Sequence, residues 1–159
     1  MEQKNHSVLG LAVIVAALGY FVDIYDLLLF SIIRIPSLKS LGLDDAAIAK
    51  DGLKIINIQM MGLLVGGIFW GILGDKKGRL KVLYASIILY SLGNIANGFV
   101  QSVNQYAAVR FITGLGLAGE LGAGITLVSE LLSKEKRGIG TSFVAGVGLT
   151  GAVFAFFIK

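Results

Sequence analysis

The sequence predicts an all-α integral membrane protein, and three observations support this prediction. Hydrophobic residues make up 55% of the 159 residues and charged residues only 15%, whereas soluble domains carry about 25% charged residues. The mean hydropathy is +0.81. Apolar segments alternate with charged connections along the chain, and each segment approaches the roughly 20 residues that a helix needs to cross a bilayer core.

The apolar segments predict five membrane-spanning helices within one partial transmembrane domain, residues 1–159. They run from about 8 to 33, 53 to 74, 80 to 100, 105 to 132 and 139 to 158. The first is not a cleavable signal peptide, because its apolar stretch continues past two acids and no small-residue cleavage site follows. Pro36 is expected to end this helix, and a short surface helix is expected to follow Asp44 and Asp45.

Basic residues in the connections predict the orientation, because lysine- and arginine-rich loops remain in the cytoplasm. The N-terminal tail and the connections after the second and fourth spans hold Lys4, Lys76, Lys77, Arg79, Lys81, Lys134, Lys136 and Arg137. The opposite side holds Arg34, Lys39, Lys50 and Lys54, diluted by Asp44, Asp45 and Asp51. The N-terminus is therefore predicted to be cytoplasmic.

Several functions are excluded by what the chain contains. It has no cysteine, and its single histidine, His6, lies in the polar N-terminal tail, so we expect no metal site and no cofactor. No nucleophile and base stand out, which argues against an enzyme. The basic residues lie between apolar spans rather than on one soluble face, so no nucleic-acid partner is expected. The pattern G-x-G-x-x-G from Gly114 to Gly119 lies inside a continuous apolar helix, which excludes a dinucleotide site.

The connection between the second and third spans carries a specific motif. Gly71, Asp75, Gly78, Arg79 and Lys81 follow one another with fixed spacing between two apolar segments. This pattern resembles the signature loop of the major facilitator superfamily. The resemblance implies a secondary transporter that works by alternating access in the bacterial cytoplasmic (inner) membrane. Among its members, the chain is most similar to proton-coupled symporters of phosphate, organic acids and sugar acids.

The resemblance also implies an architecture. Members of the superfamily have two six-helix halves, and each half is built from two three-helix repeats of inverted topology. The chain would then hold the first five helices of the N-terminal half. The sixth helix and the second half would come from a longer protein or from a partner.

The first span contains two acids, Asp23 and Asp26, and their spacing places both on one helix face. An acid at the bilayer centre costs roughly 2.5–3.5 kcal/mol on insertion scales, so it normally faces a cavity or a partner. These acids are therefore candidates for proton coupling. The alternative is an ion pair that holds helices together. Tyr20 in the same stretch and Gln59 in the second span are candidate substrate contacts.

The string Asp-Ile-Tyr-Asp-Leu around these acids also resembles the first helix of proton-coupled phosphate symporters, in which an acid matching Asp23 is tied to proton coupling. The fourth span resembles the family's fourth-helix motif: Arg110, then a glycine ladder, then Glu120. Glu120 and Asp23 lie at similar depths in helices that the inverted repeat makes equivalent. We expect both to face one central cavity, with Glu120 as a proton or substrate site or as a structural ion pair.

Arg110 has two interpretations. It lies near the end of its span, so its side chain could extend to the outer headgroups. Alternatively, it attracts an anionic substrate or stabilises an acid. Gly114 and Gly122, four residues to either side of Ala118, are expected to form a flat packing face, as are Gly71 and its neighbours in the second span. Gly78 is also expected to serve packing.

Four charged residues at the predicted cytoplasmic end are expected to form an ion network that closes the inner gate: Asp75, Arg79, Glu130 and Arg137. The spacing of Glu130 and Arg137 resembles the inner charge cluster of sugar-porter-like members. The alternative is an ordinary solvated loop. Aromatic residues near the span ends, Trp70 and Tyr106 among them, are expected in the membrane interface.

The sequence therefore predicts proton-coupled symport of a small, anionic metabolite. The fifth span lacks the Gly-Pro motif that is typical of drug:proton antiporters in this family, which favours symport. The proton would be the coupling ion, and the partners would be the lipid bilayer, the substrate and the missing second half. The alternative function is a non-transporting membrane subunit or a nutrient sensor on the same scaffold.

Overall fold

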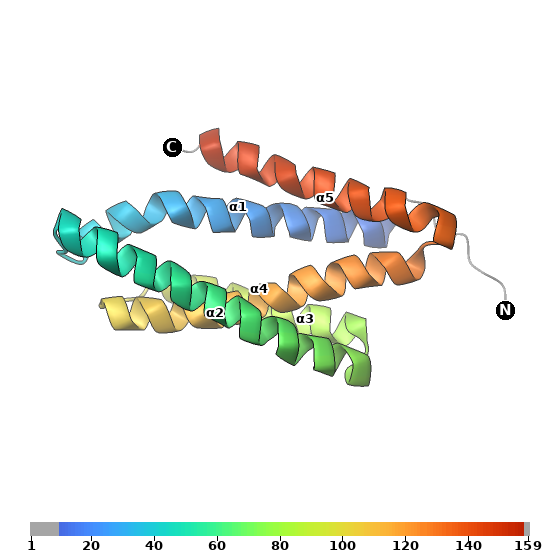
Figure 1. Cartoon of the computed structure of the whole chain (residues 1–159), viewed down its shortest axis with the longest axis horizontal. Coiled ribbons are helices and arrows are strands. Elements are labelled where there is room, and N and C mark those ends of the chain that lie inside the picture. The colour runs from blue at the N-terminus through green and yellow to red at the C-terminus, as the bar shows by residue number, and fades with distance from the viewer. Residues whose placement is uncertain (1–9, 158–159) are drawn as a thin grey trace.

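The computed structural model describes residues 10–157, and all regular structure in this range is α-helical. The helices are α1 (Leu11–Ser40), α2 (Asp45–Lys77), α3 (Arg79–Asn97), α4 (Val103–Leu131) and α5 (Lys134–Phe157). They lie along one long axis and alternate in direction, so that the α2–α3 and α4–α5 connections lie at the same end (Figure 1). The all-α prediction is confirmed, and these two basic connections share one end as expected.

Four of the five described helices, α1, α2, α4 and α5, are long and apolar enough to cross a membrane. The helix α3 has 19 residues and does not meet this criterion, since Lys81, Asn94 and Asn97 reduce its hydropathy. Its outer face nevertheless exposes Ile88 and Leu92. Four of the five predicted spans therefore have the length and composition of a membrane-crossing helix.

The prediction that Pro36 ends the first helix is wrong, because α1 continues to Ser40 with the proline inside it. Proline has no N–H, so the helix loses one backbone hydrogen bond there. This loss lies within the last two turns. Leu38, beyond the proline, is fully buried in an apolar cluster with Ile55 and Tyr106, and this packing favours continuation of the helix.

The short surface helix expected after Asp44 is not a separate element. The side chain of Asp44 accepts a hydrogen bond of 2.7 Å from the backbone N–H of Ala47 and caps the start of α2. From Asp45 the helix runs for 33 residues without interruption. The predicted surface helix is therefore the first part of α2.

The helices α2 and α4 pack with their backbones in contact. A Cβ atom at Gly62 would meet the carbonyl oxygen of Phe111, and one at Gly114 would meet the carbonyl oxygen of Gln59. Only glycine allows so close an approach. The packing role predicted for Gly114 is confirmed.

The helices α1 and α5 pack in the same way. A Cβ atom at Gly151 would meet the carbonyl oxygen of Phe21, and one at Gly148 would meet the ring of Tyr20. These two contacts, α4 with α2 and α1 with α5, are among the most extensive in the molecule. An inverted repeat that relates helices 1 and 2 to helices 4 and 5 would produce this pairing.

Three other predicted packing glycines do not lie at helix contacts. Gly71 and Gly122 have no neighbouring atom within 4 Å of the position of a Cβ atom. Gly78 has a φ of 92° and ends α2, so its role is the turn rather than packing. On α4, the close contacts to α3 come instead from Gly116 and Gly119.

Two aromatic residues predicted for the membrane interface are buried. Trp70 is 7% exposed, and its indole Nε1 donates a hydrogen bond of 2.7 Å to the carbonyl oxygen of Leu115. Tyr106 is buried edge-on against Phe30, with the ring centroids 5.8 Å apart. The interface prediction is wrong for both residues because neighbouring helices cover these sides of α2 and α4.

Candidate functional site

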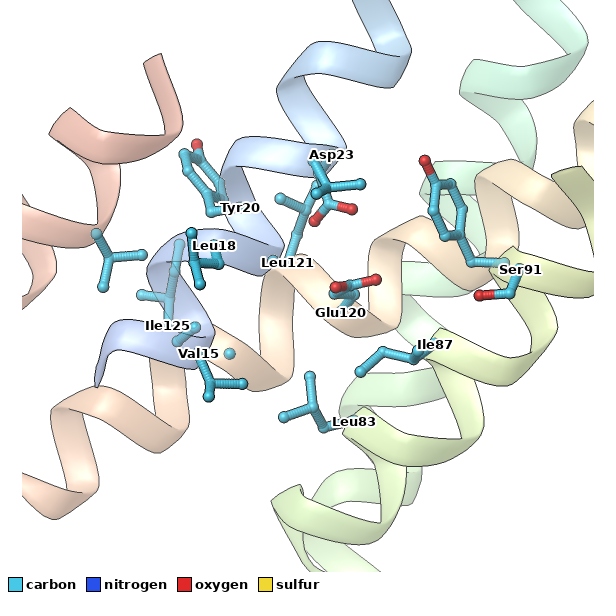
Figure 2. A pocket seen from close by; sticks show the side chains of 16 residues that line it. Val15, Leu18, Tyr20, Asp23, Leu83, Ile87, Ser91, Glu120, Leu121 and Ile125 are labelled. Atoms are coloured by element: carbon cyan, nitrogen blue, oxygen red, sulfur yellow. The ribbon is translucent and has the colours of Figure 1, made fainter. Parts of the chain in front are cut away.

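A cavity of about 310 Å³ lies between α1, α3 and α4, with Val144 of α5 at its margin. Its walls are mainly apolar and include Val15, Leu18, Val22, Leu83, Ile87, Leu121 and Ile125. The polar residues that line it are Tyr20, Asp23, Tyr90, Ser91 and Glu120. Figure 2 shows the carboxyl groups of Asp23, from α1, and Glu120, from α4, near the middle of this space, with Leu83 and Ile87 of α3 across from α1.

Asp23 has an unusual environment. Its residue is 0% exposed, and neither carboxyl oxygen has a hydrogen-bond partner in the described part of the chain. Buried polar groups in proteins are almost always hydrogen-bonded. A charged carboxylate without a donor or a cation is costly in a low-dielectric environment. Asp23 therefore needs a bound proton, a hydrogen-bond donor or a cation as its partner.

Glu120 reaches the same cavity from α4. Its Oε1 atom lies against Gly19 of α1, where a Cβ atom would come within 2.9 Å. Gly19 thus provides the space for this carboxyl group one helical turn from Asp23. Asp23 and Glu120 thus line one cavity, which lies between α1, α3 and α4, and their roles in proton coupling stay predictions.

Asp26 and Arg110 form a buried ion pair instead of lining the cavity. The Nη1 atom of Arg110 is 3.6 Å from Oδ2 of Asp26. The guanidinium carbon lies 3.6 Å from the ring centroid of Phe30 and 5.8 Å from that of Tyr106, and both distances are within the range of cation–π attraction. Arg110 is 7% exposed.

This geometry bears on the interpretations of both residues, whose roles stay predictions. Arg110 points into the contact between α1 and α4, not to the end of its span. For Asp26, the ion-pair alternative is the arrangement that the structure shows. The pair holds α1 against α4, beside the cavity that contains Asp23.

The two candidate substrate contacts differ in position. Tyr20 lines the cavity, and its ring also fills the space above Gly148 of α5. Gln59 is 2% exposed and lies in the contact between α2 and α4, where its backbone carbonyl oxygen faces Gly114. Gln59 is not part of the cavity wall.

The ion network at the far end of the molecule is partly as predicted. The Nη2 atom of Arg79 donates to Oδ1 of Asp75 at 2.5 Å, and its Nε atom is 3.7 Å from Oε1 of Glu130. Arg137 does not join this network, because its Nε donates to the backbone carbonyl of Leu132 at 3.2 Å. Arg79 therefore connects α2, α3 and α4 by itself.

Some residues of the cavity and of the ion network were not predicted. Leu83, Ile87, Tyr90 and Ser91 of α3 line the cavity and were not among the predicted site residues. Their spacing of three and four residues places them on one helix face, which is the signal that would have identified them. Gly74 was also missed. A Cβ atom there would meet Nη1 of Arg79 at 2.8 Å, so Gly74 makes room for the arginine of the ion network.

The fold and the site define a helical membrane protein with an unpartnered acid, Asp23, in a cavity between its helices. The sequence model of the Major Facilitator Superfamily matches residues 8–158 of the chain. The chain belongs to this superfamily, and the resemblance based on the signature loop is confirmed.

Individual relatives are named as transporters of different solutes. The chain is 35% identical over 124 residues to the niacin transporter NiaP of Acinetobacter baylyi, a match that covers 78% of the chain and 27% of the relative. It is 32% identical over 149 residues to the low affinity inorganic phosphate transporter 3 of Petunia hybrida, which covers 86% of the chain and 27% of that protein. No solved structure matches the chain.

The chain spans only a part of these relatives. The matched segments amount to between 27% and 37% of the length of the first relatives found. The family is therefore shown for the chain, and the activity of the whole protein is a matter for proposal.

Proposed function

We propose that the protein is a secondary transporter that couples the symport of a small metabolite to protons. The observation that carries this proposal is the pair of carboxyl groups in one cavity, one of them, Asp23, fully buried and without a partner. Membership in a superfamily of transporters and the names of the relatives support transport rather than catalysis.

The proposed coupling uses the cavity acids as proton carriers. A proton on an oxygen of Asp23 removes the unpaired charge that burial makes costly. Loss of this proton leaves a charge that must find water, a donor or a cation. The two protonation states of Asp23 and Glu120 therefore favour different arrangements of the surrounding helices, and a difference of this kind is what alternating access requires.

The ion pair of Asp26 and Arg110 is a second part of the proposed coupling mechanism. Their ion pair joins α1 to α4 at 3.6 Å. Protonation of Asp26 would weaken the attraction to Arg110 and so loosen the contact between the two helices. We propose that the pair stabilises one state of the transport cycle. Besides its approach to Asp26, the guanidinium of Arg110 has two donor atoms, Nε and Nη1, without a hydrogen-bond partner among the described residues, so it can also bind an anionic group of a substrate.

The charged network of Asp75, Arg79 and Glu130 is proposed as the cytoplasmic latch of an outward-facing state. The orientation follows the loop charges, with the N-terminus in the cytoplasm and the protein in a bacterial cytoplasmic membrane. The second half of a complete transporter, in the same chain or in a partner, would form the opposite wall of the transport path.

The test is uptake by the intact protein in proteoliposomes, with niacin, inorganic phosphate and benzamide as solutes. We expect one of them to accumulate when the outside is more acidic, and to equilibrate only when no pH gradient is imposed. Binding without net movement in either condition would identify a sensor or a non-transporting subunit instead. Accumulation that is independent of the pH gradient would contradict proton coupling.

A further inference from the structure

We propose that Tyr90 of α3 is a positioning residue for proton coupling: its hydroxyl group donates a hydrogen bond to the charged one of the two acids of α1, and so links the protonation of Asp23 to the ion pair of Asp26 and Arg110. This inference rests on the proposed transport function and deepens it. Tyr90 keeps its own proton throughout, and the transported proton is bound and released by Asp23.

Tyr90 is held in place by α4. A Cβ atom at Gly116 would come within 2.7 Å of the backbone nitrogen of Tyr90, and one at Gly93, one turn further along α3, would meet the side chain of Thr113. Within the described residues, α1 and α3 do not pack directly against each other, although both pack on α4. The long side chain of Tyr90, which is 6% exposed, therefore carries a polar group from α3 toward the acids of α1.

The hydroxyl group of Tyr90 lies near both acids. It is beside the side chains of Asp26 and Asn94 and within electrostatic reach of Asp23, and Tyr90 and Asp23 line the same cavity. In this arrangement the hydroxyl makes no hydrogen bond of good geometry with a described residue, and neither do Oδ2 of Asp26 and both carboxyl oxygens of Asp23. One unpaired donor thus lies near three unpaired acceptor atoms.

The described residues themselves cover these atoms, so their surroundings do not depend on what packs on the outer faces of α1 and α3. The other ionisable side chains near the acids come from α4: Glu120 lies near Asp23, and Nη1 of Arg110 lies 3.6 Å from Oδ2 of Asp26. That distance is longer than a hydrogen bond, so the ion pair leaves Oδ2 of Asp26 free for a donor. Tyr20 of α1 is not a competing donor, since its ring packs on α5 and Figure 2 shows its hydroxyl group directed away from Asp23.

A single hydroxyl proton serves one acceptor at a time. When Asp23 is protonated, Asp26 is the charged acid, and hydrogen bonds to charged acceptors are the stronger ones. The hydroxyl then donates to Asp26 and supports its pairing with Arg110, while the amide of Asn94 donates to the phenol oxygen. When Asp23 releases its proton, it becomes a second carboxylate that competes for the same donor. Asp26 then depends on Arg110 alone, so the contact between α1 and α4 changes with the protonation of Asp23.

The test is infrared difference spectroscopy of the intact protein in nanodiscs, recorded between about pH 9 and about pH 5, the range in which buried carboxylic acids take up protons. A tyrosine ring band reports the hydrogen bond of the hydroxyl group. In the parent, we expect this band to shift as protonated carboxyl groups appear. The shift should be absent in Tyr90→Phe, which keeps the ring and its packing, and in Asp23→Asn. The matched control Tyr84→Phe removes a hydroxyl from the same helix at a position that is 61% exposed, and should keep the shift.

Uptake in proteoliposomes gives a second readout, with niacin, inorganic phosphate or benzamide, whichever accumulates in the parent. Tyr90→Phe should reduce accumulation driven by a pH gradient about tenfold or more, as expected for loss of a hydrogen bond to a charged group. Exchange of the same solute without a gradient should continue at a rate close to that of the parent. Tyr84→Phe should change neither quantity.

The inference is overturned if the parent shows no tyrosine shift, if the shift persists in Tyr90→Phe or in Asp23→Asn, or if Tyr90→Phe accumulates solute as the parent does. The spectra require neither a solute nor a gradient, so the role of Tyr90 and the transport function can fail separately. Equal accumulation by the parent and by Tyr90→Phe would keep proton-coupled transport and reject the role of Tyr90. The expected spectra from a protein that moves no solute would reject transport and keep the link between Tyr90 and the two acids.

Discussion

Asp23 and Asp26 lie on one helix, three residues apart, and the structure gives them different surroundings. Asp23 is fully buried in the cavity wall without a partner, whereas Asp26 is paired with Arg110. The positions of these acids and of Glu120 could be read from hydrophobicity and spacing. The partner of Asp26 could not, because it depends on how α4 is rotated about its axis relative to α1.

The buried pair of Asp26 and Arg110 leads to the first prediction. Removal of one partner leaves an uncompensated buried charge, which costs about 3–5 kcal/mol. Arg110→Met should therefore lower the free energy of unfolding strongly in detergent, since it leaves Asp26 alone. The double variant Asp26→Asn, Arg110→Met should recover most of this loss.

A double-mutant cycle on thermal unfolding measures the coupling. If the effects of Asp26→Asn and Arg110→Met simply add, the two side chains do not interact in the folded protein.

The helix contacts show a similar division between what the sequence predicts and what it does not. Repeated glycines predicted close helix packing, and Gly62 and Gly114 confirm it. Gly71 and Gly122 carry the same pattern without a neighbour. A glycine repeat shows only that a helix face is small. Which part of this face is covered is determined by the crossing point of the two helices, and no local signal encodes it.

The second prediction compares two glycines of α2. Gly62→Ala places a methyl group against the carbonyl of Phe111, a backbone atom that cannot move aside, and overpacking of this kind costs about 1–3 kcal/mol. Gly71→Ala adds the same group in open space and should be neutral or slightly stabilising, because alanine is the better helix former. The midpoint of thermal unfolding in detergent distinguishes them. Equal effects of the two substitutions would mean that α2 and α4 are not in backbone contact.

At the scale of the whole molecule, two tightly packed groups of helices share a smaller contact. Backbone contacts join α1 to α5 and α4 to α2, and α3 packs closely on α4. The cavity and the Asp26–Arg110 pair lie where these two groups meet. The sequence predicted the class of fold and the alternation of the helices. It did not predict that α3 forms a cavity wall, because the placement of α3 against α1 depends on how both helices pack on α4.

The third prediction concerns the ion network centred on Arg79. If this network closes the cytoplasmic side, Asp75→Asn in the intact protein should increase the labelling of a cavity cysteine by reagents applied from the cytoplasm. The shift should correspond to about 1–3 kcal/mol, because Asp75 is exposed and its pair is screened by water.

The matched control is Arg137→Gln. It removes a nearby charge that bonds to the carbonyl of Leu132 rather than to the network, so the labelling should not change. An equal response to both substitutions would reduce the network to a cluster of loop charges.

The orientation of the molecule gives the fourth prediction. Single cysteines at Lys77 and Lys136, which lie at the end where the basic connections meet, should react only with reagents that reach the cytoplasm. A cysteine at Ser40, at the opposite end, should react with impermeant reagents from outside. The reverse pattern would place the ion network outside the cell and exclude its role as an inner latch.

The most direct test of proton coupling through the cavity acids is transport by Asp23→Asn in proteoliposomes. Asparagine keeps the size of the side chain and resembles the protonated acid, so it separates charge from packing. We predict that this variant exchanges solute across the membrane but no longer accumulates it in response to a pH gradient. Asp45→Asn, which alters a carboxylate whose side chain is 90% exposed, should accumulate solute as the parent does. Accumulation at the parental level by Asp23→Asn, and also by Glu120→Gln, would contradict the assignment of proton coupling to these acids.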